Sequence, residues 1–181
     1  MDWFMSFDPG TVNLGYSFGT LAEGWTAPTP LYCNTISVVP KSTRLNKVDL
    51  SVRAAKLIDD ILSTHTKEKD PSRIVVFIED QMGRNTTSNV IVGVIASLCY
   101  SKYRIERVVS VSPKLKNDVI LLPFEEQKNG GSVAGNNKKK AALKIAKEMF
   151  DMISTDHEAD SLLQVIAYCR RHASHNGAQC I

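Results

Sequence analysis

Three carboxylates stand where rigid secondary structure can hold them for chemistry. Asp8 ends an apolar run and is followed by Pro9-Gly10, a pattern that predicts a strand and then a tight turn. Glu79 ends a second apolar run, residues 73–79, in the same way. Asp160 lies beside the apolar stripe of a predicted helix, where a half-buried acid needs a cation, a hydrogen-bond donor or a metal. We therefore expect three acids from separate segments to share one site.

Carboxylate oxygens gathered in this way are the ligands that Mg²⁺ and Mn²⁺ prefer. Two such ions roughly 3.5–4 Å apart can bind both the attacking and the leaving oxygens of a phosphodiester displacement. A fourth ligand would come from the opening of the same helix, where Asp156 lies four residues and His157 three residues before Asp160. The residues alone leave this choice open, because acids are also favoured in a first helical turn. Asp8 by itself is equally compatible with a simple turn.

The strands that must position these acids form an α/β pattern. The first three are joined by short turns, with residues 26–30 as a turn, so they predict an antiparallel meander with the first strand central. The continuous apolar run that ends at Glu79 predicts a strand buried on both faces, hence a parallel one. Ligand sites in open α/β sheets lie beyond the carboxyl ends of strands, so Asp8 and Glu79 should lie side by side. The predicted strands cover residues 3–8, 14–20, 31–39, 73–79 and 105–111.

Helical periodicity and capping signals account for most of the rest. Asn85 or Thr86 can cap the second helix, and Thr155-x-x-Glu158 fits a capping box at the last one. Ser112-Pro113 predicts a further short helix. A glycine-containing loop is expected over residues 123–137, and the chain from Ala173 looks unanchored, which gives one domain, 1–173, and a flexible tail, 174–181. The predicted helices cover residues 45–64, 87–101, 138–151 and 155–172.

Charge is unevenly distributed along the chain. The net charge is +3, but residues 101–147 hold eleven Lys and Arg against four Asp and Glu. A basic surface of this kind attracts a polyanion, although a solvated helix face is the alternative. Its lysines include Lys114 and Lys116 at the short helix, and then Lys138, Lys139, Lys140, Lys144 and Lys147.

Composition narrows the class of protein. A chain of 181 residues with 43% apolar and 23% charged residues is typical of one folded domain. The longest uncharged apolar stretch, residues 90–100, is too short to cross a bilayer, and the first residues do not form a signal peptide. Four cysteines without C-x-x-C spacing favour an intracellular, reducing compartment and argue against a zinc site.

Taken together, these motifs resemble the RuvC family of Holliday-junction resolvases. The forms Ile78-Glu79-Asp80-Gln81 and Val111-Ser112-Pro113-Lys114 look closer to the resolvases of poxviruses, other large DNA viruses and fungal mitochondria than to the bacterial ones. The match covers nearly the whole chain. In order, the motifs are Phe7-Asp8-Pro9-Gly10-Thr11 with Gly15-Tyr16, Val76-Phe77-Ile78-Glu79-Asp80-Gln81, and His157-x-x-Asp160-Ser161-Leu162.

The resemblance implies an RNase H-like fold, a five-stranded mixed sheet flanked by helices. It implies a crossover junction endodeoxyribonuclease that resolves four-way DNA junctions by paired hydrolysis and leaves 5′-phosphate and 3′-hydroxyl ends. The cofactor would be Mg²⁺, with Mn²⁺ able to substitute, and no small-molecule cofactor. The protein would act as a homodimer on branched DNA, away from membranes, in the cytoplasm or nucleus of a host cell if it is viral.

The resemblance also implies residue roles. Asp8, Glu79 and Asp160 match the metal-binding acids of the family, and the fourth ligand matches Asp156 or His157, of which we prefer Asp156. The lysine that the family uses near the scissile phosphate matches Lys116. The residues expected to contact DNA are Met82, Arg84, Lys114, Lys138, Lys139 and Lys140, one of the last three matching a second active-site lysine.

Rival functions remain open at this level. The same fold could serve a nuclease acting on RNA–DNA hybrids or flaps, or a junction-binding protein without catalysis, although all the candidate ligands are present. A sugar-kinase-type ATP-binding domain would require a second phosphate loop, and Gly130-Gly131 is too far from any predicted strand end to provide one.

Overall fold

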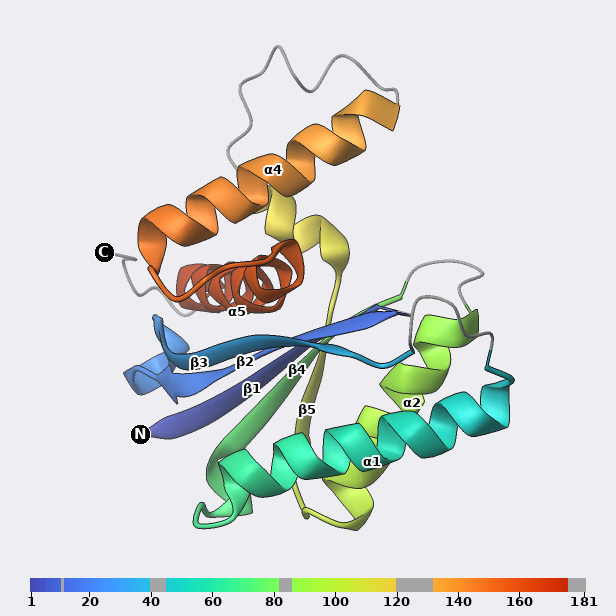
Figure 1. Cartoon of the computed structure of the whole chain (residues 1–181). Coiled ribbons are helices and arrows are strands. Elements are labelled where there is room, and N and C mark those ends of the chain that lie inside the picture. Colours follow the sequence, from blue (N-terminus) through green and yellow to red (C-terminus); the bar gives the residue numbers. More distant parts are fainter. Residues whose placement is uncertain (11, 40–44, 82–85, 120–131, 176–181) are drawn as a thin grey trace.

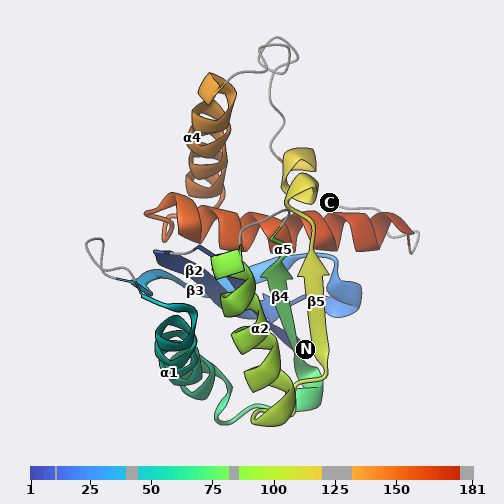
Figure 2. The same ribbon diagram turned by 90° about the vertical axis from the view of Figure 1, so that its right-hand side faces the viewer.

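The computed structural model describes residues 1–10, 12–39, 45–81, 86–119 and 132–175. A five-stranded sheet in the order β3-β2-β1-β4-β5 lies between two layers of helices (Figure 1). Helices α1 and α2 cover one face, α5 covers the other, and α4 packs on the outer side of α5 (Figure 2). The strands are β1 (Asp2–Pro9), β2 (Asn13–Leu21), β3 (Pro28–Ser37), β4 (Ile74–Glu79) and β5 (Arg107–Val111), and the helices are α1 (Lys47–Thr66), α2 (Thr86–Ser101), α4 (Ser132–Met149) and α5 (Asp156–His175), with 3₁₀ turns η1 (Glu23–Trp25), η2 (Pro71–Arg73) and η3 (Pro113–Asp118).

The register of β1 determines where the acids lie. β1 pairs antiparallel with β2, so that Asp8 faces Gly15 across the pair, and parallel with β4, up to Phe7 opposite Ile78. Asp8 and Glu79 are therefore the next residues along two neighbouring parallel strands. The predicted meander, the central position of β1 and the parallel orientation of β4 are all confirmed.

Alternation along the strands assigns each side chain to a face. Met5 and Phe7 point into the core beneath α1 and α2, whereas Phe4 packs in the core beneath α5. Asp8 follows Phe4 by four residues and therefore lies on the α5 side. Glu79 lies on the same side, because Phe77 belongs to the α5 core.

Three boundaries differ from the prediction by three residues or more. Strand β3 begins at Pro28, inside the predicted turn, because an edge strand tolerates proline on its unpaired side. Helix α4 begins at Ser132, so residues 132–137 are helical and not part of a loop, while residues 123–131 lie outside the described residues. Helix α5 continues to His175 with Ala173 buried, so the chain is still anchored where the tail was expected to begin.

Two cysteines lie in the core, and the described helices bear on the predicted lack of a membrane-spanning segment. Cys99 and Cys169 are buried in the apolar parts of α2 and α5. Within the described part of the chain, none of the helices is long and apolar enough to span a bilayer.

Candidate active site

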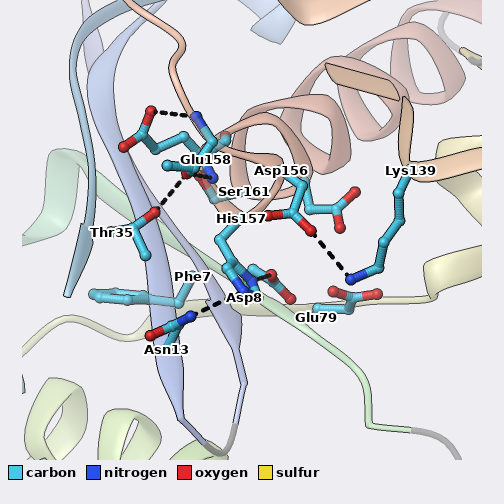
Figure 3. A network of polar contacts seen from close by, with 12 residues as sticks. Phe7, Asp8, Asn13, Thr35, Glu79, Lys139, Asp156, His157, Glu158 and Ser161 are labelled. Atoms are coloured by element: carbon cyan, nitrogen blue, oxygen red, sulfur yellow. Dashed lines mark hydrogen bonds and ion pairs between the residues drawn. The ribbon is translucent and has the colours of Figure 1, made fainter. Parts of the chain in front are cut away.

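Asp8 and Glu79 lie together at the carboxyl ends of β1 and β4, and the first turn of α5 adds His157 (Figure 3). Asp160 follows one turn later in α5. All four side chains line one pocket of about 410 Å³. Asp8 and Glu79 are each only 8% exposed, and Lys116, from η3, is 7% exposed. The structure therefore brings four of the predicted site residues and the predicted active-site lysine into one buried cluster.

The opening of α5 is fixed by the predicted capping box. The Thr155 hydroxyl accepts a hydrogen bond from the Glu158 amide at 3.2 Å, and the Glu158 carboxylate accepts one from the Thr155 amide at 3.2 Å. The same carboxylate accepts from the Ser154 amide at 2.7 Å. The Thr155 and Thr35 hydroxyls are 2.7 Å apart, which ties the start of the helix to β3 (Figure 3).

A close approach to β2 completes this placement. A Cβ atom at Gly15 would lie 2.2 Å from the carbonyl oxygen of His157. Glycine is therefore required at this position for α5 to approach the sheet. Because Gly15 is the pairing partner of Asp8, the contact sets His157 directly beside that carboxylate.

His157 and Asp8 form an ion pair. The Nδ1 atom of His157 lies 3.0 Å from Oδ2 of Asp8, and this hydrogen bond raises the pKa of His157. Burial alone would raise the pKa of Asp8, but hydrogen bonds from His157 and Glu79 and the charge of Lys116 together hold that pKa below its usual range. Asp8 is thus the ionised member of the carboxyl cluster.

The pKa of Glu79 is shifted in the opposite direction. Burial and the hydrogen bond that it donates to Asp8 raise the pKa of Glu79 to about 8. Burial also raises the pKa of Asp160, against the opposing effect of Lys116. Carboxyl groups this close resist ionising together, so the cluster retains a proton unless further positive charge is supplied.

Lys116 supplies positive charge at the centre of the cluster. Its Nζ atom lies 3.1 Å from Oε1 of Glu79 and 3.2 Å from Oδ1 of Asp160. Burial alone would lower the pKa of Lys116, but Asp160, Glu79 and Asp8 outweigh that effect and raise it. The Ser112 side chain caps η3 and, with Pro113 in its first turn, fixes the backbone that carries this lysine.

The donor set fits a hard divalent cation in its chemistry, because three carboxyl groups from three elements line the same pocket. Among the described residues, however, no group of three His, Cys, Asp and Glu side chains is spaced to hold an ion as it stands. The ammonium of Lys116 lies between Glu79 and Asp160. Binding of an ion by these acids would compete with that contact.

Asp156 and His157 are distinguished by their contacts. The Asp156 side chain is 37% exposed and accepts a hydrogen bond from Lys139 at 3.1 Å, while His157 points towards Asp8 (Figure 3). Although burial opposes it, the hydrogen bond from Lys139 holds the pKa of Asp156 below its usual value. The geometry thus favours His157 over Asp156 as the nearest fourth ligand.

The predicted DNA-contacting residues are placed less completely. Lys139 lines the pocket, and Lys114 and Lys140 are exposed on η3 and α4. Met82 and Arg84 lie outside the described residues, as does the side chain of Lys138.

Two pocket residues and one buried residue were not anticipated. Asn13 and Gln81 line the pocket, but single polar residues in a turn or loop give no distinctive signal. Gln164 was passed over within the apolar stripe of α5, although a polar residue between buried apolar positions is itself a signal.

Comparison with solved structures identifies the architecture. The chain superposes on Thermus thermophilus RuvC with a TM-score of 0.59 at 13% identity, covering 97% of each chain. It has the fold of the RuvC resolvases. T. thermophilus RuvC in complex with a Holliday junction substrate gives a TM-score of 0.61 at 12% identity, covering 98% of this chain and 97% of that chain. The fowlpox virus resolvase in complex with substrate Holliday junction DNA gives 0.56 at 14% identity, covering 93% of this chain and 97% of that chain.

This likeness confirms the predicted α/β fold with its five-stranded mixed sheet and the RNase H-like architecture. No model of a known protein family matches the sequence, and no curated protein sequence matches it. At such low identity the likeness is one of fold, so the argument for activity rests on the site.

Proposed function

We propose that this chain is a metal-dependent endonuclease that resolves four-way DNA junctions by phosphodiester hydrolysis. The observation that carries the proposal is the convergence of Asp8, Glu79, Asp160 and Lys116 in one buried cluster at the strand ends of a RuvC-like sheet. Buried, charge-rich clusters with shifted pKa values are characteristic of catalytic sites. A purely structural role would not require so many buried acids.

In this proposal Asp8, Glu79 and Asp160 hold Mg²⁺ or Mn²⁺, with His157 as the further ligand. Such ions supply activation of the attacking water and stabilisation of the charge on the leaving 3′-oxygen. The protein contributes rigidity, because two ligands are strand residues and two are fixed by the capped start of α5. The backbone that carries the ligands is thus fixed before the substrate arrives.

Lys116 would act on the scissile phosphate. A cation beside a phosphate contributes more in the transition state, where negative charge is redistributed, than in the ground state. Lys116 is held by η3 between Glu79 and Asp160, and despite its burial these acidic neighbours raise its pKa and keep it charged. With Glu79 and Asp160 engaged as metal ligands, the Lys116 ammonium would be available to the phosphate.

Helix α4 provides a surface for the DNA backbone. Its exposed lysines lie on a helix that packs outside α5 (Figure 1), and Lys139 lines the pocket. Contacts of this type give affinity that is independent of base sequence and falls with added salt. The exposed lysines of α4 are Lys139, Lys140, Lys144 and Lys147.

A four-way junction offers two symmetric strands, so we propose that the protein acts as a homodimer with two sites. Helix α2 is the proposed contact face. Gly93 is exposed there, and a Cβ atom added to it would meet no other atom.

The test is cleavage of a synthetic four-way junction in Mg²⁺, with EDTA as the control, in competition with an RNA–DNA hybrid and a flap of matched length. Preferential, metal-dependent cleavage of the junction supports the proposal. Preferential cleavage of the hybrid or flap would assign the site to a different nucleic acid. Tight junction binding without any cleavage would point to a non-catalytic binding protein.

A further inference from the structure

Gln164 is a polar residue in the most deeply buried part of α5. Its side chain has no exposed surface, and the residues on either side of it in the helix, Leu163 and Val165, are also fully buried. An apolar residue is the ordinary choice at such a position, because burying an amide has a cost unless it is fully hydrogen-bonded. Its contacts must therefore explain its presence.

The contacts of Gln164 lead to the strand that carries Asp8. Its Nε2 atom donates a hydrogen bond to the carbonyl oxygen of Phe7 at 3.0 Å and a short one to the Ser6 hydroxyl. Phe7 is the residue immediately before Asp8. The amide thus joins the middle of α5 to the two residues of β1 that precede Asp8.

The position of Gln164 in the helix connects it with the other ligands. His157, Asp160 and Gln164 are spaced by three and four residues, so they share one face of α5. The backbone of that face meets the sheet at Gly15 through the His157 carbonyl, and its Gln164 side chain meets the sheet at Phe7. Asp160 lies between these points, so its distance from Asp8 depends on both.

Only one end of the Gln164 amide is hydrogen-bonded to the described part of the chain. Within the described residues, Oε1 of Gln164 and the hydroxyl oxygen of Ser17 make no hydrogen bond, although both are buried. Ser17 is the cross-strand partner of Ser6, so the unsatisfied atoms belong to the same polar row beneath α5. An apolar side chain would avoid this cost, so stability alone does not account for the residue.

We infer that Gln164 is a positioning residue that sets the distance between α5 and β1, and so the spacing of Asp160 and His157 from Asp8 for metal binding. The inference rests on the proposed metal site but not on the nature of the nucleic acid. Partners that orient metal ligands from outside the coordination sphere commonly change metal affinity when they are removed.

The test is calorimetric titration of Mn²⁺ into the full chain without DNA, for wild type and Gln164→Met. Methionine has a similar unbranched shape but cannot donate to Phe7. We expect the dissociation constant for Mn²⁺ to rise by about 10–100-fold, with little change in melting temperature. The Mn²⁺ concentration that half-saturates cleavage should rise by the same factor.

Leu163→Ala is the matched control. Leu163 is buried in the same turn of the helix, but its apolar side chain cannot form a hydrogen bond to β1. It should lower the melting temperature and leave Mn²⁺ affinity unchanged. Ser6→Ala should have a smaller effect than Gln164→Met, because the bond to Phe7 remains. Gln164→Asn, with a shorter amide, provides a second variant if methionine prevents folding.

Unchanged Mn²⁺ affinity in Gln164→Met, or an equal loss in Leu163→Ala, would overturn the inference. So would failure of both Gln164 variants to fold, which would assign the residue to stability, or a wild type that binds no Mn²⁺. A wild type that binds Mn²⁺ in a Gln164-dependent way but cuts no junction would support the inference and reject only the proposed substrate.

Discussion

At the scale of single residues, Lys116 has two proposed partners, because its ammonium group pairs with acids but should also contact DNA. It is paired with both Glu79 and Asp160 in the structure, yet the proposed reaction needs it at the phosphate. A residue of this kind should affect the rate of the chemical step more than the affinity for DNA.

We predict that Lys116→Ala lowers the single-turnover cleavage rate at saturating enzyme by about 10²–10³-fold, with little change in junction affinity. Lys140→Ala is the control, because Lys140 is exposed on α4. It should weaken binding and reduce the salt slope by about one unit while keeping the rate at saturation. A Lys116→Ala protein that regains the full rate once the junction is saturated would place Lys116 on the general DNA-binding surface.

The fourth ligand gives a second residue-scale prediction. His157→Ala should lower the cleavage rate by more than tenfold, a barrier increase above about 1.4 kcal/mol, because His157 contacts Asp8 directly. Asp156→Asn should cost less than tenfold, since Asp156 is held at Lys139. An imidazole ligand should also favour Mn²⁺ over Mg²⁺. The measurement is the cleavage rate of both variants in Mg²⁺ and in Mn²⁺. If Asp156→Asn lowers the rate more than His157→Ala does, Asp156 is the fourth ligand.

At the scale of elements, α5 carries the site and its capping box fixes where it starts. We predict that Glu158→Ala lowers the free energy of unfolding by about 1–2 kcal/mol, because the Ser154 and Thr155 amides lose their acceptor. Glu148→Ala is the matched control on α4. Glu148 is exposed and lies 3.8 Å from Lys144, so its loss should cost less than about 0.5 kcal/mol. Equal effects in urea unfolding would show that the cap contributes nothing particular to α5.

Sequence patterns predicted those parts of the fold that depend on local signals. The strands that end in Asp8 and Glu79, and the Thr155–Glu158 cap, were recognisable because polar residues end apolar runs or occupy fixed offsets. The start of α4 differs from the prediction because Gly135, Asn136 and Asn137 are weak helix formers, so composition alone favours a loop there.

The choice between Asp156 and His157 could not be made from spacing. Positions three and four residues before Asp160 both lie near its face of the helix. The decisive contact is between His157 and Asp8, which are 149 positions apart in the chain. Gln164 likewise depends on a long-range contact, with Phe7, that no local pattern encodes.

At the scale of the whole molecule, Asp2 links three elements at the end of the sheet opposite the site. Its carboxylate accepts hydrogen bonds from Trp25 at 2.9 Å and from Arg107 at 3.0 Å, which joins β1, η1 and β5. The hydrogen bond from Trp25, with the nearby Arg107 and Arg73, lowers the pKa of Asp2 below its usual 3.8. A lowered folded-state pKa stabilises the fold above the unfolded value, and this contribution is lost as pH falls through the folded value.

We therefore predict that Asp2→Asn lowers the melting temperature at neutral pH and that its difference from wild type shrinks as the pH falls below 3.8. Thermal unfolding of both proteins over an acid pH series measures this difference. A gap that stays constant down to the lowest pH would mean that the ion pairs of Asp2 do not stabilise the folded state.

Resolution of a junction by paired cuts is the central claim, and the form of the products tests it most directly. A four-way junction with each strand labelled in turn is incubated with the protein in Mg²⁺ and then with DNA ligase. We predict symmetric cuts in two opposing strands and nicked duplexes that ligase seals, with no cutting in EDTA or by Asp8→Asn, which should still bind the junction. An intact junction in Mg²⁺, or full cutting by Asp8→Asn, would contradict the proposed function.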